Sequence, residues 1–180
     1  MKKYIIILIA LVAFSCKKEE KKDRTNEKLR VVTTTSQITD LVKALGGDLV
    51  EIDGLMGAGV DPHLYKASEG DVTKFYNADV IFYSGLHLEG KLEDVFEKMR
   101  HQGKKTIAIS DAILTSDLIS SADFASSYDP HFWFSIPKWK KATEYVAEEL
   151  SNLDAKNAVK YAANAKGYIE KLSALEEINT

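Results

Sequence analysis

Residues 29–47 read LRVVTTTSQITDLVKALGG and decide the fold, because they predict a strand followed directly by a helix. The stretch 29–35 is short, rich in β-branched residues and polar at its end, which is typical of a buried strand. Apolar residues then recur at helical spacing from Ile38 to Leu45, so the helix has one apolar face. A pair of glycines at 46–47 ends this helix.

The same alternation continues along the chain. Further strands are predicted over 49–52, 78–83 and 105–109, and further helices from Ser68 and over 91–101, 137–150 and 154–178. Strands that alternate with helices of about ten residues form βαβ units, and the strands of such units pair in parallel. We therefore expect an α/β fold with a parallel sheet, in which ligands bind beyond the carboxyl ends of the strands.

The composition excludes several classes of protein. The chain has 180 residues, with 24 Lys and Arg against 27 Asp and Glu and a formal net charge of -3. Nucleic-acid-binding domains usually carry a basic face and a high pI, so no nucleic-acid partner is expected. The single cysteine, Cys16, excludes an intramolecular disulfide and any CxxC metal site.

The beginning of the chain predicts a targeting segment. A basic start precedes an apolar run over 4–14, which is too short to cross a bilayer as a helix but matches the core of a signal peptide. Cys16 follows in a setting that resembles a bacterial lipobox, so residues 1–15 are expected to be a lipoprotein signal peptide and Cys16 to carry the lipid. The alternative is an ordinary signal peptide with a cysteine nearby by chance. Charged residues dominate 16–28, which predicts a flexible tether between a membrane anchor and an extracytoplasmic domain.

Two histidines share one local context. Residues 61–63 and 129–131 both read Asp-Pro-His, and each lies in a loop predicted to follow a strand. Proline stiffens the backbone before the imidazole, and neutral imidazole is the commonest metal-ligating side chain. His63 and His131 are therefore candidate ligands of one metal ion. The alternative is that Asp-Pro makes a turn and each histidine lies on the surface.

The other two histidines predict different roles. His87 lies just past the strand over 78–83, where we expect a partner that supports a metal ligand or a wall of the cleft. His101 ends an apolar-faced helix, where a histidine suits the helix dipole, so its role is structural. The sequence holds no phosphate-binding glycine loop, no G-x-S-x-G nucleophile elbow and no HExxH, so no catalytic residue is assigned and an enzyme is not expected.

Four stretches carry a resemblance to a known family. They read GVDPHLY at 59–65, ADVIFY at 78–83, GLHLE at 85–89 and DPHFW at 129–133. In this order they resemble the zinc- and manganese-binding class of ABC-transporter solute-binding proteins, which are often lipoproteins. Members of that class have two α/β lobes joined by one long helix, with the metal in the cleft between the lobes.

The resemblance implies a site and partners. It implies that His63 and His131 are the metal ligands of the N-terminal lobe and that two further ligands come from the C-terminal lobe. It implies a metal receptor that carries zinc or manganese as its cargo, has no catalytic cofactor, and passes the ion to a membrane permease driven by an ATPase. Both metals accept imidazole. The long His-rich acidic loop of some zinc-specific relatives is absent, which favours manganese or a less selective receptor.

The resemblance also implies a domain organisation. Residues 29–150 match an N-terminal lobe with a four-stranded parallel sheet flanked by helices, and 151–180 match the start of the long linking helix. We therefore expect a truncated or split form, with a C-terminal half chain as a possible partner. Two other interpretations stay open: a metal-dependent hydrolase that uses a two-histidine site, and a non-functional remnant lipoprotein.

Without a second lobe, the final helix should expose part of its apolar stripe. This stripe consists of Tyr161, Ala165, Tyr168 and Leu172. Large exposed apolar patches favour association. We therefore expect the chain to self-associate and to bind metal weakly on its own, because a tight zinc site needs about four ligands.

Overall fold

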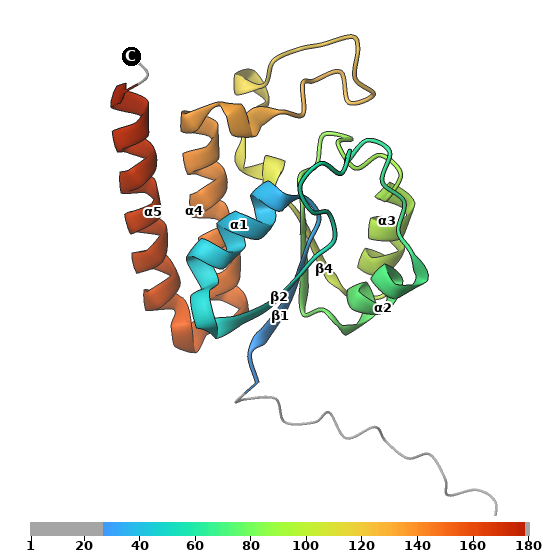
Figure 1. The fold of residues 1–180 in the computed structure, drawn as a ribbon, viewed down its shortest axis with the longest axis horizontal. Coiled ribbons are helices and arrows are strands. Elements are labelled where there is room, and N and C mark those ends of the chain that lie inside the picture. Colours follow the sequence, from blue (N-terminus) through green and yellow to red (C-terminus); the bar gives the residue numbers. More distant parts are fainter. Residues whose placement is uncertain (1–26, 179–180) are drawn as a thin grey trace, which may run out of the picture.

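The computed structural model describes residues 27–178, which are built around a four-stranded sheet (Figure 1). The strands are β1 (Leu29–Thr33), β2 (Val50–Gly54), β3 (Val80–Tyr83) and β4 (Lys105–Ala108). They stand in the order β2-β1-β3-β4, and every neighbouring pair is parallel. The predicted α/β fold with a four-stranded parallel sheet is confirmed.

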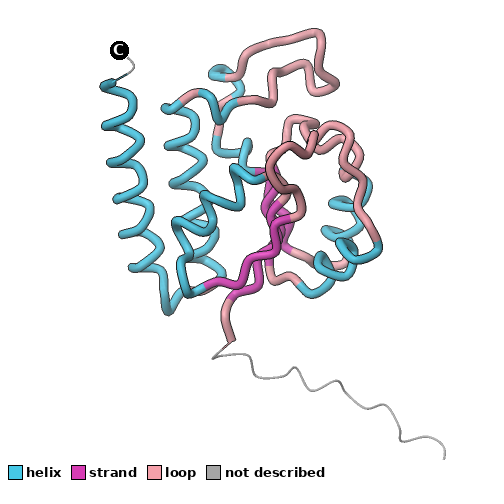
Figure 2. Tube along the Cα trace, viewed as in Figure 1, coloured by secondary structure: helices cyan, strands magenta, loops and turns pink. Residues whose placement is uncertain are grey.

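Helices cover both faces of this sheet (Figure 2). They are α1 (Ser36–Gly46), α2 (Glu69–Asn77), α3 (Glu93–His101), α4 (Ile136–Leu153) and α5 (Ala158–Ile178). Helices α1, α4 and α5 lie on one face, and α2 and α3 lie on the other (Figure 1). Both faces are therefore covered, and the loops at the carboxyl ends of the strands remain available for a site.

Alternate residues of the strands feed two separate cores. Side chains of a strand point to opposite faces in turn. Val31 and Phe82 pack with α1, α4 and α5, whereas their neighbours Val32 and Ile81 pack with α2 and α3. This burial on both faces explains why the central strand β3 (VIFY) is apolar throughout, whereas the edge strand β2 (VEIDG) keeps exposed Glu51 and Asp53.

The element boundaries differ slightly from the predicted ones. Strand β1 ends at Thr33 instead of 35, because the carbonyl of Thr35 already accepts the first helical hydrogen bond from the Thr39 N–H at 3.0 Å. Helix α2 begins after Ser68, whose hydroxyl accepts from the Asp71 N–H, so the predicted start is confirmed. Helix α5 begins at Ala158, because a short 3₁₀ turn separates it from α4.

The expectation of an exposed stripe on the final helix is wrong. Tyr161 and Ala165 are buried, and Tyr168 and Leu172 are half-buried against the same core. The short connection lets α5 fold back along α4 (Figure 1), where Tyr168 accepts a hydrogen bond from the Trp139 indole at 3.2 Å. This lobe therefore uses the stripe for its own core, and the reason for expecting self-association through it disappears.

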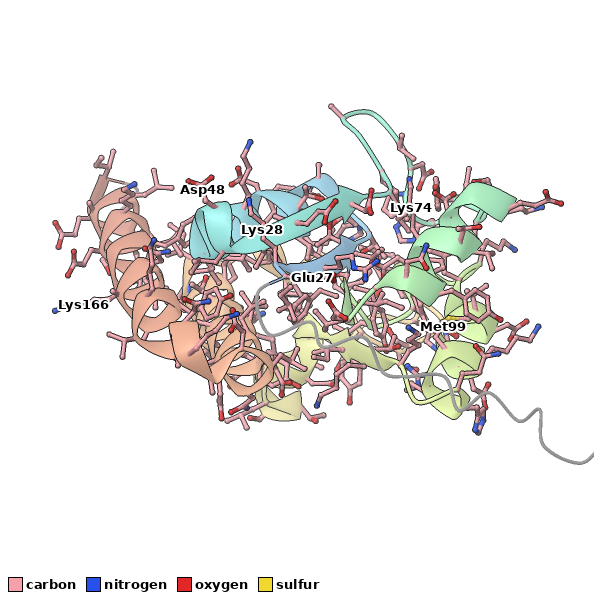
Figure 3. All side chains as sticks on the ribbon, turned by 90° about the horizontal axis from the view of Figure 1, so that it is seen from below. Glu27, Lys28, Asp48, Lys74, Met99 and Lys166 are labelled. Atoms are coloured by element: carbon pink, nitrogen blue, oxygen red, sulfur yellow. The ribbon has the colours of Figure 1, made fainter. Side chains whose placement is uncertain are left out.

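Charged side chains stand out from the surface of the described residues (Figure 3), beside a number of exposed apolar ones such as Phe134 and Val159. Lys166 on α5 and Asp48 before β2 are exposed and point away from the body of the lobe (Figure 3). Within residues 27–178, none of the helices combines the length and the apolar composition that crossing a bilayer requires. The predicted signal peptide at 1–15, the lipidation site Cys16 and most of the tether at 16–28 lie outside the described residues.

Candidate metal site

The two Asp-Pro-His loops meet at the carboxyl edge of the sheet. His63 lies on the loop that follows β2, and His131 lies on the long segment that follows β4. Their imidazole ring centroids are 5.6 Å apart, with the ring planes inclined at 62°. Both side chains are half-buried. The fold thus brings together two imidazoles that are far apart in the sequence, at the edge where ligands of parallel sheets bind.

A cavity of about 320 Å³ opens beside the two imidazoles. The start of α1, the loop after β2 and the segment after β4 contribute its lining, which includes Thr35, Ser36, Met56, His63, His131 and Trp133. The cavity gives an ion and its water ligands access to both rings.

The two Asp-Pro-His motifs share a backbone turn. In each, the aspartate accepts a hydrogen bond from the histidine N–H at 2.9 Å, from His63 to Asp61 and from His131 to Asp129. This turn fixes the backbone of both histidines in the same way, as their identical local sequence predicts.

Only the second motif also fixes its imidazole. Asp129 Oδ1 lies 2.7 Å from His131 Nδ1. The hydrogen bond from the His131 N–H lowers the pKa of Asp129, so this carboxylate is ionised and can only accept. In the neutral imidazole, Nδ1 therefore donates to this carboxylate, and Nε2 is the nitrogen left with a lone pair for a metal. Among the described residues, the ring of His63 has no such hydrogen bond.

Aromatic rings surround the two imidazoles. Phe124 stacks on His63 with ring centroids 6.2 Å apart and planes inclined at 17°, and its ring centroid lies 5.5 Å from that of His131. Trp133 approaches His131 edge-on at 5.1 Å. These apolar neighbours restrict how far each imidazole can rotate.

Asp71 fastens the far end of the loop that carries His63. Its Oδ2 accepts hydrogen bonds from the Tyr65 hydroxyl at 2.8 Å, the Ser68 N–H at 2.9 Å and the Ser68 hydroxyl at 2.7 Å. Burial alone would raise the pKa of Asp71, but the hydrogen bonds from Ser68, Tyr65 and Lys74 outweigh it and lower the pKa to about 2. Burial and the neighbouring carboxylate raise the pKa of Tyr65 to about 12.

Glu89 ties together the ends of the two central strands. Its side chain is 1% exposed and accepts hydrogen bonds from the Thr34 hydroxyl at 2.6 Å, the Ser84 N–H at 2.8 Å and the Gly85 N–H at 3.3 Å. Burial raises the pKa of Glu89 against the opposing effect of these hydrogen bonds. This carboxyl group joins the carboxyl ends of β1 and β3.

The structure places the other two histidines away from the imidazole pair. His87 Nδ1 lies 2.7 Å from Glu93 Oε1, and His87 is not among the residues that line the cavity. Its expected role as a support for a metal ligand or as a wall of the cleft stays a prediction. His101 is exposed in the last turn of α3, 3.6 Å from Glu97, and its structural role there stays a prediction.

Comparison with known proteins identifies the lineage of the chain. The family described as zinc-uptake complex component A, periplasmic (ZnuA), matches residues 31–179. The chain belongs to the ZnuA family. The resemblance drawn from the four sequence stretches is thereby confirmed.

Relatives in the ZnuA family are metal-binding transport proteins. The manganese-binding lipoprotein MntA of Bacillus subtilis is 42% identical over 172 residues, which make up 95% of this chain and 56% of MntA. The zinc-binding protein TroA of Treponema pallidum is 39% identical over 146 residues, which make up 81% of this chain and 46% of TroA. The solved structure of TroA matches with a TM-score of 0.79 and 38% identity, over 84% of this chain and 53% of that chain. This chain thus spans about half the length of these relatives.

The described part of this ZnuA-family chain gathers few side chains that could hold a metal ion. Within residues 27–178, no three His, Cys, Asp or Glu side chains are gathered so that they could hold a metal ion. The two imidazoles are therefore alone, whereas a catalytic zinc usually has three protein ligands. In this part of the chain, no third side chain supports the hydrolase interpretation.

Several residues that shape the site carry little signal in the sequence. Phe124 lies in a stretch without periodicity, and the contact between Tyr65 and Asp71 depends on how a loop closes. In the sequence, Glu89 stands only within the GLHLE stretch. The available signal is an acidic side chain in the segment that follows an apolar strand, which leaves its burial and partners open.

Proposed function

We propose that this chain is the N-terminal lobe of an extracytoplasmic metal-binding lipoprotein that serves an ABC importer. The ion, zinc or manganese, is its cargo. The observation that carries the proposal is the pair of imidazoles, His63 and His131, with ring centroids 5.6 Å apart beside a cavity at the ligand-binding edge of the sheet. The metal-binding relatives MntA and TroA support it.

In this proposal the two histidines hold the ion from one side. His131 binds through Nε2, because Asp129 occupies its Nδ1, and His63 supplies a second imidazole nitrogen. Two ligands are half of a zinc coordination shell. The remaining ligands come from a second lobe, from a partner half chain or from water, so the lobe alone binds weakly.

The proposal includes an arrangement along the chain. Residues 1–15 direct export and are removed, lipid on Cys16 anchors the mature chain at the cell membrane, and 16–28 are the tether. Residues 29–150 form the metal-receptor lobe, and 151–180 begin the segment that links it to a second lobe. An anchored receptor keeps its ion close to the permease and ATPase of the importer, because acyl chains hold a soluble domain at the membrane surface. The protein is a carrier and not an enzyme.

Zinc binding to the purified full chain tests the proposal. Replacement of either His63 or His131 by alanine should weaken zinc binding at least about tenfold, because one imidazole then remains. His101→Ala is the matched control, since this histidine is exposed on α3 and outside the site, and it should leave the Kd unchanged. Competition against a chelating dye measures all four proteins. Equal zinc affinity of the wild type and the His63→Ala protein would refute the shared site.

A further inference from the structure

The two imidazoles of the site are held in different ways. Asp129 fixes the ring of His131 through a 2.7 Å contact to Nδ1, whereas Asp61 reaches only the backbone N–H of His63. The ring contacts of His63 are those with Phe124 and His131. The orientation of the His63 imidazole therefore depends on aromatic packing instead of a hydrogen bond.

Phe124 reaches this position from a small hairpin. The Asp129 N–H donates to the Ile119 carbonyl at 2.8 Å, and the Ser121 N–H donates to the Ser127 carbonyl at 3.0 Å, so the hairpin closes on itself. Ser127 adopts a positive φ of 63° at the turn back. The backbone of the hairpin thus defines its shape without help from the rest of the lobe.

The tip of the hairpin offers one large side chain that can position it, whereas Ile119 and Tyr128 lie at its base. Residues 120–127 read SSADFASS, in which Phe124 is the only apolar side chain larger than alanine. Serine and alanine offer little surface to bury, whereas a phenylalanine ring offers much more. The contact of Phe124 with the two imidazoles therefore holds the tip of the hairpin in place.

We propose that Phe124 is the positioning residue for His63, holding its imidazole at the angle from which both histidines face one ion. The inference rests on the metal site proposed above. The Phe124 ring lies nearly parallel to His63, at 17°, and steeply inclined to His131, at 64°, so one ring sets the relative orientation of both imidazoles. The residues that line the cavity do not include Phe124, so its ring supports the pair without filling the space for the ion.

Three variants of the full chain test this role. Phe124→Leu keeps apolar bulk but removes the flat ring, and Phe124→Tyr keeps the ring. Phe134→Leu is the matched control, because Phe134 is 81% exposed and its ring contacts Trp133 at 5.6 Å instead of an imidazole. Thermal unfolding of each variant confirms that the lobe stays folded, as expected for substitutions in a surface segment.

Two measurements detect the effect of each substitution: the imidazole resonances of His63 and the zinc Kd. In the metal-free protein, the ring current of Phe124 shifts the imidazole C–H resonances of His63, and Phe124→Leu should remove this shift while Phe124→Tyr and Phe134→Leu retain it. The zinc Kd should rise about tenfold in Phe124→Leu, because loss of a residue that orients a ligand usually costs about 10–100-fold. It should stay within about threefold of the wild type in the other two variants.

The outcomes separate the two proposals. Zinc binding that is lost in His63→Ala but unchanged in Phe124→Leu overturns the positioning role alone. Unchanged His63 resonances in Phe124→Leu overturn it as well. Zinc binding that survives His63→Ala overturns the proposed function, and the positioning role falls with it.

Discussion

The carboxylate of Asp71 fastens the loop that carries His63 to α2, and the substitution Asp71→Asn tests how strongly it does so. Asparagine has the same shape but no charge, so it imitates the protonated carboxyl group. The hydrogen bonds from Tyr65, Ser68 and Lys74 all go to the ionised form. Loss of the charge should therefore destabilise the fold at neutral pH.

The expected loss follows from the pKa of Asp71. The pKa falls from the ordinary value of 3.8 to about 2. One pKa unit corresponds to about 1.4 kcal/mol, so ionised Asp71 contributes about 2 kcal/mol to the free energy of unfolding. Loss of a helix cap together with a charged hydrogen bond gives a cost of the same order, about 2–3 kcal/mol.

The pH dependence has a definite sign. The pKa of Asp71 is lower in the folded state than in the unfolded state, so its stabilisation is fully present above the unfolded value of 3.8 and is lost as the pH falls towards 2. Urea denaturation at pH 7 should show the wild type more stable than Asp71→Asn by about 2 kcal/mol, and at pH 3 by about half of that.

A matched control separates the effect of losing Asp71 from that of losing any carboxylate. Asp40→Asn removes an exposed carboxylate from α1 and should change the free energy of unfolding by less than about 0.5 kcal/mol at either pH. A difference between the wild type and Asp71→Asn below about 0.5 kcal/mol at pH 7, or one that does not shrink at pH 3, would refute the assigned role of Asp71.

Two further pairs of variants test single contacts. Asp129→Ala should raise the zinc Kd by about 10–100-fold because it frees an imidazole, whereas Asp61→Ala frees only a backbone N–H and should change it by less than about threefold. Equal effects in dye competition would contradict this difference. Gly85→Ala should cost about 2 kcal/mol or more in urea denaturation, because its Cβ would lie 2.2 Å from Ser110 Oγ at a φ of 90°. Gly103→Ala, at a φ of 77° in open space, should cost about 1 kcal/mol. Equal losses of stability in Gly85→Ala and Gly103→Ala would show that crowding against Ser110 does not affect stability.

Much of the fold could be predicted because the local patterns agree with the final packing. The apolar residues of α1 lie at helical spacing in the sequence and on the buried face in the structure. The apolar stripe of α5 is buried although the sequence predicts that part of it is exposed, and the reason is physical. Periodicity tells which face of a helix is apolar but not what covers it, and here Tyr161 and Ala165 pack into the core of the same lobe.

The histidines of the site could be predicted from a repeated residue pattern. The contacts that orient them could not, because they depend on packing. The repeated Asp-Pro-His sequence singled out His63 and His131, and the structure brings their rings together. It did not reveal that Asp129 reaches an imidazole while Asp61 does not, because the two motifs are identical in sequence. That difference depends on the orientation of each loop, which distant contacts decide.

The strand order explains why these particular loops meet. From β1 the chain moves outward to β2, and from β3 it moves outward to β4, so the winding reverses between β1 and β3. Glu89 accepts hydrogen bonds from the Thr34 hydroxyl after β1 and from the Ser84 N–H after β3. These bonds make the edge of the sheet rigid at this reversal. The long loops after β2 and β4 approach each other beyond this edge, and each carries one histidine. The inner strands thus supply a fixed base and the loops after the outer strands supply the two imidazoles, at the switch point where parallel sheets bind ligands.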